Sequence, residues 1–181
     1  MMEENPIERR IHVVQGEQAV CIGEPGTMMT TVLGSCVAAC IRDPMAGIGG
    51  MNHFLLPGDV SSSSDVRYGV YAMEVLINGL LKAGAKRERL EAKLFGGARM
   101  LDRISDIGAS NARFATSFIE NEGIKNLGGS LGGSSARRIQ YWPFSGYARQ
   151  ALVDVDMVKE VKQEVAVAKA APADGGELEL F

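Results

Sequence analysis

Two apolar runs separated by a turn constrain the fold of this chain more than any other feature of its sequence. Residues 36–42 are mostly small or β-branched and lack a helical stripe, and residues 48–56 are again largely apolar until Pro57-Gly58 ends the run. The segment between them, residues 43–47, has the Asp-Pro and Gly composition of a turn. The pattern therefore predicts a β-hairpin over residues 36–56.

The predicted hairpin brings a thiol and an imidazole to one face of the sheet. A register that pairs Asp43 with Ile48 places His53 diagonal to Cys36, and a register shifted by two residues places the two side chains directly opposite each other. Both registers keep them on the same face, whereas a slip of one residue would separate them onto opposite faces. The pairing thus depends on the turn, and the sequence leaves the two registers open.

A thiol beside an imidazole suits nucleophilic catalysis. An unperturbed thiol has a pKa of about 8.5 and is only slightly ionised at neutral pH. His53 would accept the proton of Cys36, and the thiolate could then attack a carbonyl while the imidazolium protonates the leaving nitrogen. Gly34 would allow a substrate to approach the backbone closely, and N–H groups near Cys36 would stabilise the oxyanion. Thr30, on the preceding strand, is the candidate for the group that orients the base.

Each of these residues also has a purely structural interpretation. A cysteine in an apolar run is commonly a small buried hydrophobic residue, and a histidine on a sheet face is commonly a hydrogen-bonded structural residue. Thr30 would serve equally well as an ordinary strand former, and the sequence does not decide whether Thr30 or Thr31 faces the histidine. Cys40 is expected in the core, since it shares the strand face of Cys36.

The composition is that of a globular domain rather than of a nucleic-acid-binding or membrane protein. Apolar residues make up 46% of the chain, charged residues make up 23%, and the net charge of −3 is spread without a long basic run. Nucleic acid is therefore not an expected partner. The acidic start lacks an apolar core and no apolar stretch reaches membrane-spanning length, so we expect a cytoplasmic protein without membrane insertion.

The cysteines favour neither a disulfide framework nor a metal site. There are three, Cys21, Cys36 and Cys40, and an odd number in a chain without an export signal argues against disulfides. A zinc site would have to combine them with His53, but the spacing from Cys36 to Cys40 is wider than the common two-residue spacer and no second cysteine pair exists. We therefore expect no metal.

Periodicity and turn residues predict the remaining elements. One helix is expected to begin at Asp65 and to stop at Gly84, a second to cover residues 111–121, and Gly128 to Gly133 to form a glycine-rich connection. Further strands are expected at residues 11–14, 18–22, 30–33, 90–95, 124–127, 139–142 and 148–153. The sequence thus predicts a single α/β domain over residues 1–157, with helices covering a mixed β-sheet, and a C-terminal tail over residues 158–181.

Two segments around the candidate residues carry a family resemblance. They are Thr30-Thr31-Val32-Leu33-Gly34-Ser35-Cys36-Val37-Ala38 and Gly49-Gly50-Met51-Asn52-His53-Phe54-Leu55-Leu56-Pro57. Their combination closely resembles the chemoreceptor glutamine deamidase family, CheD. Further segments agree with the same family from about His12 to Val153, namely Arg67-Tyr68-Gly69, Lys93-Leu94-Phe95-Gly96-Gly97-Ala98, and Ile107-Gly108 with Asn111.

The resemblance implies a fold, a reaction and roles for the candidate residues. The fold would be a three-layer α/β sandwich, similar to a glutamine-deamidating toxin domain. The reaction would be that of a protein-glutamine glutaminase, an amidohydrolase that converts glutamine side chains in the cytoplasmic region of methyl-accepting chemotaxis receptors to glutamate and releases ammonia. Cys36 would be the nucleophile, His53 the base and Thr30 the residue that supports the histidine, with water as second substrate and no metal or organic cofactor. Some members of the family also bind the phosphatase CheC.

Two other functions are compatible with the same residues. A thiol peptidase or transglutaminase uses the same acyl-thioenzyme chemistry and differs in the group that is attacked and in the attacking group. A non-catalytic module that regulates a chemotaxis phosphatase would need a complementary surface but no ionised thiol.

Overall fold

The computed structural model describes residues 7–56, 63–100 and 106–154. The expected tail, residues 158–181, lies outside these ranges. The described elements are β1 (Arg9–His12), β2 (Gln18–Ile22), β3 (Thr27–Leu33), β4 (Val37–Asp43), β5 (Ile48–Asn52), α1 (Ser63–Ala83), a short 3-10 helix (Arg87–Arg89), β6 (Glu91–Gly96), α2 (Ile107–Asn121), β7 (Lys125–Leu131), β8 (Ala136–Trp142) and β9 (Tyr147–Val153). The prediction of a mixed α/β fold is confirmed.

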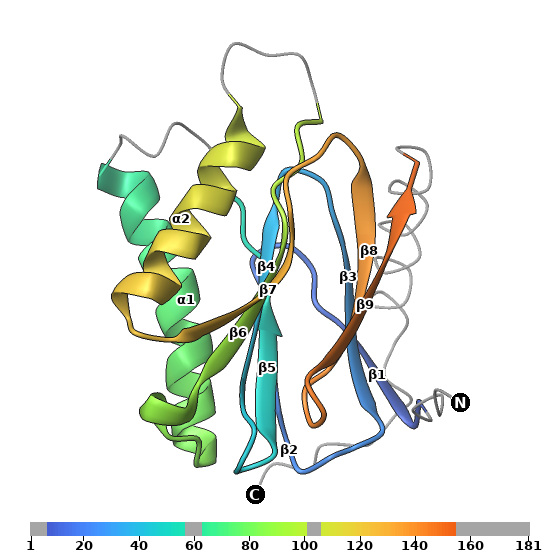
Figure 1. The fold of residues 1–181 in the computed structure, drawn as a ribbon, viewed down its shortest axis with the longest axis vertical. Helices are drawn as coiled ribbons and strands as arrows, with labels where there is room; N and C mark the ends of the chain where they lie inside the picture. The colour runs from blue at the N-terminus through green and yellow to red at the C-terminus, as the bar shows by residue number, and fades with distance from the viewer. Residues whose placement is uncertain (1–6, 57–62, 101–105, 155–181) are drawn as a thin grey trace, which may run out of the picture.

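The strands form two sheets that face each other (Figure 1). One has four strands in the order β1-β3-β8-β9, and the other has five in the order β2-β5-β4-β6-β7. Both helices cover one face of the five-stranded sheet: α1 packs on β2 and β5, and α2 packs on β4, β6 and β7. One hydrophobic core lies between the helices and this sheet. A second core, which includes Met29, Leu33, Ala38, Cys40 and Met51, lies between the two sheets.

The predicted hairpin is present as β4 and β5. Asp43 pairs with Ile48 and Cys40 pairs with Met51, which is the register that places His53 diagonal to Cys36. Gly47, with φ of 66°, supplies the left-handed conformation that closes the turn.

Hydrogen bonds to the carboxylate of Asp43 connect the turn to the rest of the domain. It is fully buried, and it accepts hydrogen bonds from the backbone N–H groups of Met45, Ala46 and Lys86 and from the guanidinium of Arg89. Burial alone would raise the pKa of Asp43, but the bonds from Arg89 and the three N–H groups outweigh it and lower that pKa to about 2.

Three predicted boundaries are wrong. The second helix begins at Ile107 rather than Asn111, because Asp106 caps it by accepting a hydrogen bond of 3.0 Å from the N–H of Ala109. The segment Gly128 to Gly133 is not simply a connection, since β7 continues to Leu131 as the edge strand beside β6. Gly128 and Gly129 have positive φ, and the pairing shifts register there, as a bulged edge strand allows. The strand expected over residues 11–14 is β1, which lies two residues earlier.

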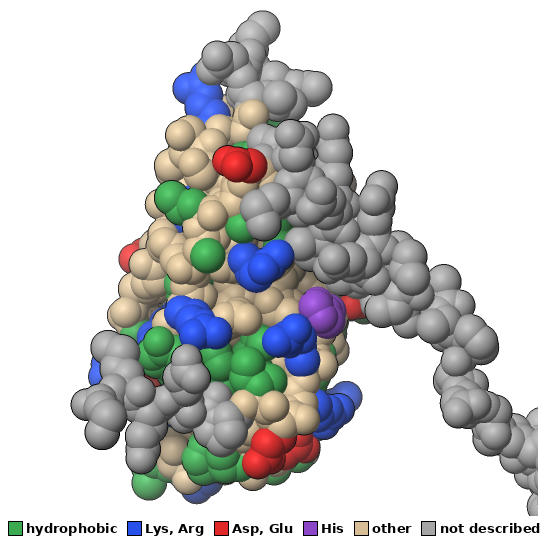
Figure 2. All heavy atoms as spheres, turned by 90° about the vertical axis from the view of Figure 1, so that its right-hand side faces the viewer, with side chains coloured by type: hydrophobic (Ala, Val, Ile, Leu, Met, Phe, Trp, Pro, Cys, Tyr) green, Lys and Arg blue, Asp and Glu red, His purple; other side chains and the backbone are tan. Residues whose placement is uncertain are grey.

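Basic side chains do not form one continuous patch on the face of the molecule shown in Figure 2. Lys and Arg side chains in the visible part of this face are separated by polar, apolar and acidic groups. On the four-stranded sheet, Arg149 lies 5.4 Å from the ring centroid of Trp142 and donates a hydrogen bond to Gln140. No helix within the described ranges is both long and apolar enough to cross a membrane.

Candidate active site

Cys36 and His53 lie at the open end of the hairpin, just outside the two strands. Val37 and Phe54 exchange two backbone hydrogen bonds of 3.0 and 2.9 Å, which carry the register beyond β5. His53 is therefore opposite Ala38 and diagonal to Cys36. Ala38 belongs to the core between the sheets, so the shared face of Cys36 and His53 points toward the four-stranded sheet.

The two side chains differ in exposure. His53 is buried, whereas Cys36 is only partly buried, against the core between the sheets. The Sγ atom of Cys36 lies 3.6 Å from Oε1 of Gln15, on the loop between β1 and β2. Cys36 thus remains partly accessible to solvent, with the Gln15 side chain beside its sulfur.

The imidazole of His53 is held from the opposite sheet. Its Nδ1 atom lies 2.8 Å from Oγ1 of Thr31 and 3.3 Å from the carbonyl oxygen of Val13. A carbonyl oxygen can only accept a hydrogen bond, so its contact favours the tautomer with the proton on Nδ1. In that tautomer Nε2 is the nitrogen that can accept a proton.

Thr30 and Thr31 take different positions, although both are buried on β3. The hydroxyl of Thr30 donates a hydrogen bond of 2.8 Å to the carbonyl oxygen of Ile139 on β8. Successive side chains of a strand point to opposite faces, so only one of the two threonines can face the histidine. The structure places Thr31, rather than Thr30, beside the ring; the burial of Met29 and Leu33 in the core between the sheets shows that the odd-numbered residues of β3 face inward.

The backbone around Cys36 is held by hydrogen bonds to three consecutive carbonyl groups. The carbonyl oxygens of Gly34 and Cys36 accept hydrogen bonds from the N–H groups of Ala98 and Gly97, at 2.9 and 2.8 Å. The carbonyl oxygen of Ser35 accepts a 2.9 Å hydrogen bond from the side-chain amide of Asn111 on α2. All three carbonyls therefore point toward the β6–α2 side of the site.

Sequence reasoning gave no site role to Asn111, Gln15 or Val13. In the sequence, Asn111 stands out only as part of a family motif. Its position on the inner face of α2 could have been inferred from the helical period that also buries Ala115 and Phe118. Gln15 and Val13 carry no signal in the sequence, because a loop and a backbone carbonyl bring them to the site.

The other two cysteines are core residues. Burial, together with the nearby Glu24, raises the pKa of Cys21 to about 11, and burial raises the pKa of Cys40 well above its ordinary value. Both thiols are thus disfavoured as thiolates, and the expectation that Cys40 is a core residue is confirmed. Among the described residues, no group of three or more His, Cys, Asp or Glu side chains is placed to hold a metal ion.

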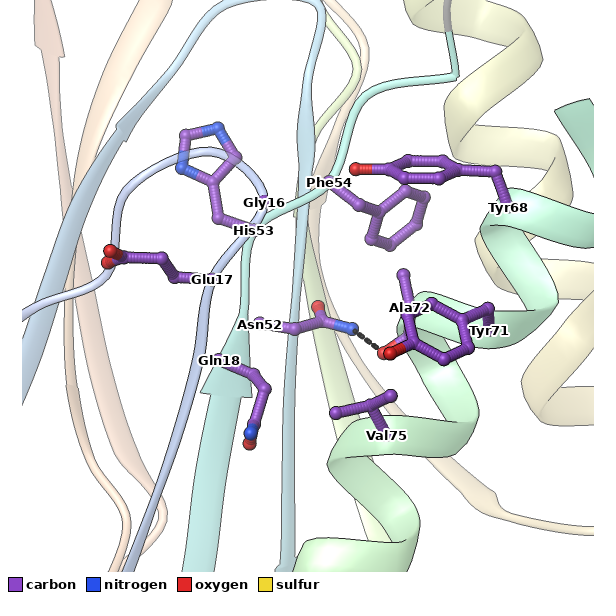
Figure 3. A pocket seen from close by; sticks show the side chains of 10 residues that line it. All are labelled: Gly16, Glu17, Gln18, Asn52, His53, Phe54, Tyr68, Tyr71, Ala72 and Val75. Carbon is purple, nitrogen blue, oxygen red and sulfur yellow. Dashed lines mark hydrogen bonds between the residues drawn. The ribbon is translucent and has the colours of Figure 1, made fainter.

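A cleft of about 420 Å³ lies beside His53, between α1 and the edge of the five-stranded sheet (Figure 3). Tyr68 and Tyr71 of α1 form one wall, and Gln18 and Asn52 contribute amide groups from the sheet. Asn52 also donates a hydrogen bond of 3.2 Å to the carbonyl oxygen of Ala72. Both tyrosines are exposed, so this wall of the cleft is accessible to solvent.

Comparison with known proteins identifies the family. The model of the family described as CheD chemotactic sensory transduction matches residues 55–151. A probable chemoreceptor glutamine deamidase CheD of Caulobacter sp. strain K31 is 57% identical over 95% of this chain and 93% of its own length. Proteins with the same name from Rhizobium meliloti strain 1021 and Agrobacterium fabrum are 53% and 50% identical, over 92% and 96% of this chain and 93% and 97% of their own lengths.

Among solved structures, the Neisseria meningitidis protein NMB0706 is a remote match, with a TM-score of 0.48 and 9% identity over 78% of this chain and 72% of that chain. The relatives that match nearly the whole chain and the family model agree with each other. The chain belongs to the CheD family.

Proposed function

We propose that this protein hydrolyses glutamine side chains of chemoreceptors to glutamate, with Cys36 as nucleophile and His53 as base. The relatives of more than half identity carry the name of this activity. The observation that carries the proposed residues is the hairpin register, which puts a partly exposed thiol and a buried imidazole on one face, with Thr31 against the ring. The layered helices and two sheets also support the three-layer α/β sandwich that the resemblance implies.

The first half of the reaction forms a thioester. Nε2 of His53 accepts the proton of Cys36, and the resulting thiolate attacks the side-chain carbonyl carbon of the glutamine. The tetrahedral intermediate collapses when the imidazolium gives its proton to the amide nitrogen, which leaves as ammonia. Neither a cofactor nor a metal takes part in this scheme.

The second half restores the enzyme. His53, again neutral, accepts a proton from water while the water oxygen attacks the thioester carbonyl. Collapse of the second intermediate breaks the bond between carbon and sulfur and returns the proton to Cys36. The net change is the addition of one water: the amide becomes a carboxylate, and the released ammonia takes up the proton that the new carboxylic acid loses.

Thr31 is the orienting residue of this proposal, in the role that the family resemblance gives to Thr30. The hydroxyl of Thr31 is next to Nδ1 of His53, whereas that of Thr30 is bound to a carbonyl on β8. When the ring becomes an imidazolium, the Thr31 oxygen and the Val13 carbonyl can share the Nδ1 proton.

The cleft beside His53 is our proposed site for the receptor segment that carries the glutamine. His53 is one of the residues that line it, and two exposed tyrosines wall it, which provide large contact area with little loss of side-chain entropy. The proposed setting is the cytoplasm, as the sequence predicts, and the substrate region is the cytoplasmic part of the receptor.

The proposal is tested by incubating the protein with a receptor cytoplasmic fragment and following ammonia release and the glutamine-to-glutamate mass change. Cys36→Ala and His53→Asn should each abolish conversion, and Cys40→Ala, at a buried cysteine, should retain it. Conversion by Cys36→Ala at the wild-type rate would refute the mechanism.

The same assay separates the alternatives. Cleavage of the receptor backbone, or incorporation of an added amine in preference to water, would indicate a peptidase or a transglutaminase. Absence of ammonia from any receptor fragment, with undiminished binding of the phosphatase CheC by Cys36→Ala, would indicate a regulatory module.

A further inference from the structure

Asn111 joins the two segments that carry Cys36 and His53. Its Nδ2 atom donates a hydrogen bond of 2.9 Å to the carbonyl oxygen of Ser35, the residue before Cys36. Its Oδ1 atom accepts a hydrogen bond of 2.9 Å from the N–H of Leu56, three residues after His53. One fully buried side chain thus spans both segments from the first turns of α2.

The orientation of this amide follows from its two partners. The Ser35 carbonyl can only accept and the Leu56 N–H can only donate, so the Asn111 nitrogen and oxygen cannot be exchanged. Among side chains that are uncharged at neutral pH, only an amide of this length offers a donor and an acceptor in this arrangement. Aspartate would keep the bond to Leu56 but would set a carboxylate oxygen against the Ser35 carbonyl.

The bond to Ser35 also sets the direction of the backbone N–H groups beside the thiol. In a trans peptide the C=O and the following N–H point in opposite directions. The carbonyls of Gly34, Ser35 and Cys36 all point toward α2 and the β6–α2 segment. The N–H groups of the next residues must therefore point the other way, toward the extension of β5.

One of these groups supports the deduction directly. The N–H of Val37 donates to the carbonyl oxygen of Phe54, the residue that follows His53. The N–H groups of Ser35 and Cys36 belong to the two preceding peptides, which Ala98 and Asn111 hold by their carbonyls. They are consequently directed toward the side of His53, where the oxygen of a substrate amide bound at Cys36 would lie.

The geometry points to Asn111 as a positioning residue for the reaction, and this inference rests on the proposed function. Asn111 holds the Ser35-Cys36 peptide so that its N–H faces the developing oxyanion, and it fixes the separation of the segments bearing thiol and base. Its close approach depends on Gly108, because a Cβ at that position would overlap the carbonyl oxygens of Gly97 and Ala98. Asn111 itself touches no reacting atom.

The test uses two variants of the full chain, Asn111→Ala, which removes both bonds, and Asn111→Asp, which retains the acceptor for Leu56. The first readout needs no substrate: the rate at which iodoacetamide labels Cys36, followed by peptide mass spectrometry across pH. In both variants the rate at neutral pH should fall, and half-maximal labelling should move to higher pH, because the thiolate loses aligned N–H groups. Cys21 and Cys40 are buried and are distinguished by the mapping.

The second readout is deamidation of the receptor fragment. Both variants should lower kcat by about ten- to a hundredfold with little change in KM, since a misplaced catalytic group affects the transition state more than substrate binding. Asp43→Asn is the matched control, because it replaces a buried carboxylate that accepts several hydrogen bonds at the far end of the same hairpin. It should lower the melting temperature and leave kcat and Cys36 labelling as in the wild type.

The outcomes separate the two proposals. Unchanged labelling profiles in both Asn111 variants, or an equal loss of kcat in Asp43→Asn, would overturn the role of Asn111. Failure of both Asn111 variants to fold would also overturn it, because the residue would then serve the whole fold. A wild-type protein that releases no ammonia would overturn the proposed function, whereas the labelling experiment would still decide whether Asn111 positions the thiol.

Discussion

Replacing Thr31 by valine tests how the histidine is oriented. The substitution keeps the shape of the side chain and removes one hydroxyl, which lies 2.8 Å from Nδ1 of His53 in a buried setting. The carbonyl of Val13, at 3.3 Å, would remain as a longer contact to the same nitrogen. Hydrogen bonds to charged groups are roughly twice as strong as neutral ones, so the loss is greater when the ring is an imidazolium. We therefore expect about 1–2 kcal/mol less transition-state stabilisation, equivalent to a roughly 5- to 30-fold lower kcat.

Thr30→Val is the matched control for this experiment. It removes a hydroxyl with the same 2.8 Å bond length from the neighbouring residue, but that hydroxyl binds the Ile139 carbonyl rather than the ring. Both variants should lose similar stability, about 1 kcal/mol each, and only Thr31→Val should lose activity. The assay is deamidation of a receptor fragment, with thermal unfolding measured in parallel. If Thr30→Val is inactive and Thr31→Val is as active as wild type, the orientation deduced from β3 is refuted and the family-based role of Thr30 is restored.

Three further predictions follow from other parts of the molecule. The lowered pKa of Asp43 means that its stabilising effect is complete above about pH 4 and is lost as the pH falls through about 2. Asp43→Asn should therefore lower the free energy of unfolding by about 2 kcal/mol at neutral pH and should make that free energy depend less on pH in the acid range. Denaturant unfolding at several pH values measures both effects. Tyr71→Ala should raise KM for the receptor fragment several-fold with little effect on kcat, while Tyr147→Ala, on the other sheet, should leave KM unchanged; equal effects would argue against the cleft as the receptor site. Gly108→Ala should lower both the melting temperature and kcat, because the added Cβ displaces α2 from the carbonyls of Gly97 and Ala98; a fully active variant would contradict the close packing.

Most of the framework could be predicted because it rests on local patterns. The turn at residues 43–47 located the hairpin, and the observed pairing of Asp43 with Ile48 is one of the two registers that the sequence left open. The first helix ends at Ala83, before Gly84 as expected. In contrast, the start of α2 was misplaced because Gly108 weakens the helical signal, although Asp106 provides the cap.

The orienting groups of the site could not be predicted from local patterns. Thr31 reaches His53 across the gap between two sheets, and the contact depends on which face of β3 is inward. Two adjacent threonines show no alternation of polar and apolar side chains, so the sequence does not indicate which of them faces inward. The family motif gives the role to Thr30 only because of its position. Val13 acts through a backbone carbonyl, for which any residue type would serve, and Asn111 acts from a helix more than fifty positions after His53 in the sequence.

The site therefore depends on how the two sheets pack. The five-stranded sheet and its hairpin extension carry Cys36 and His53, but the group that orients the imidazole belongs to the four-stranded sheet. A shift of one sheet relative to the other would lengthen the contact between Thr31 and His53 without breaking a bond within either sheet. The core between the sheets, with Met29, Leu33 and Met51 fully buried, opposes such a shift because a displaced interior loses close contacts at once. Packing far from the sulfur thus determines whether His53 is held in the tautomer and orientation that the proposed reaction needs.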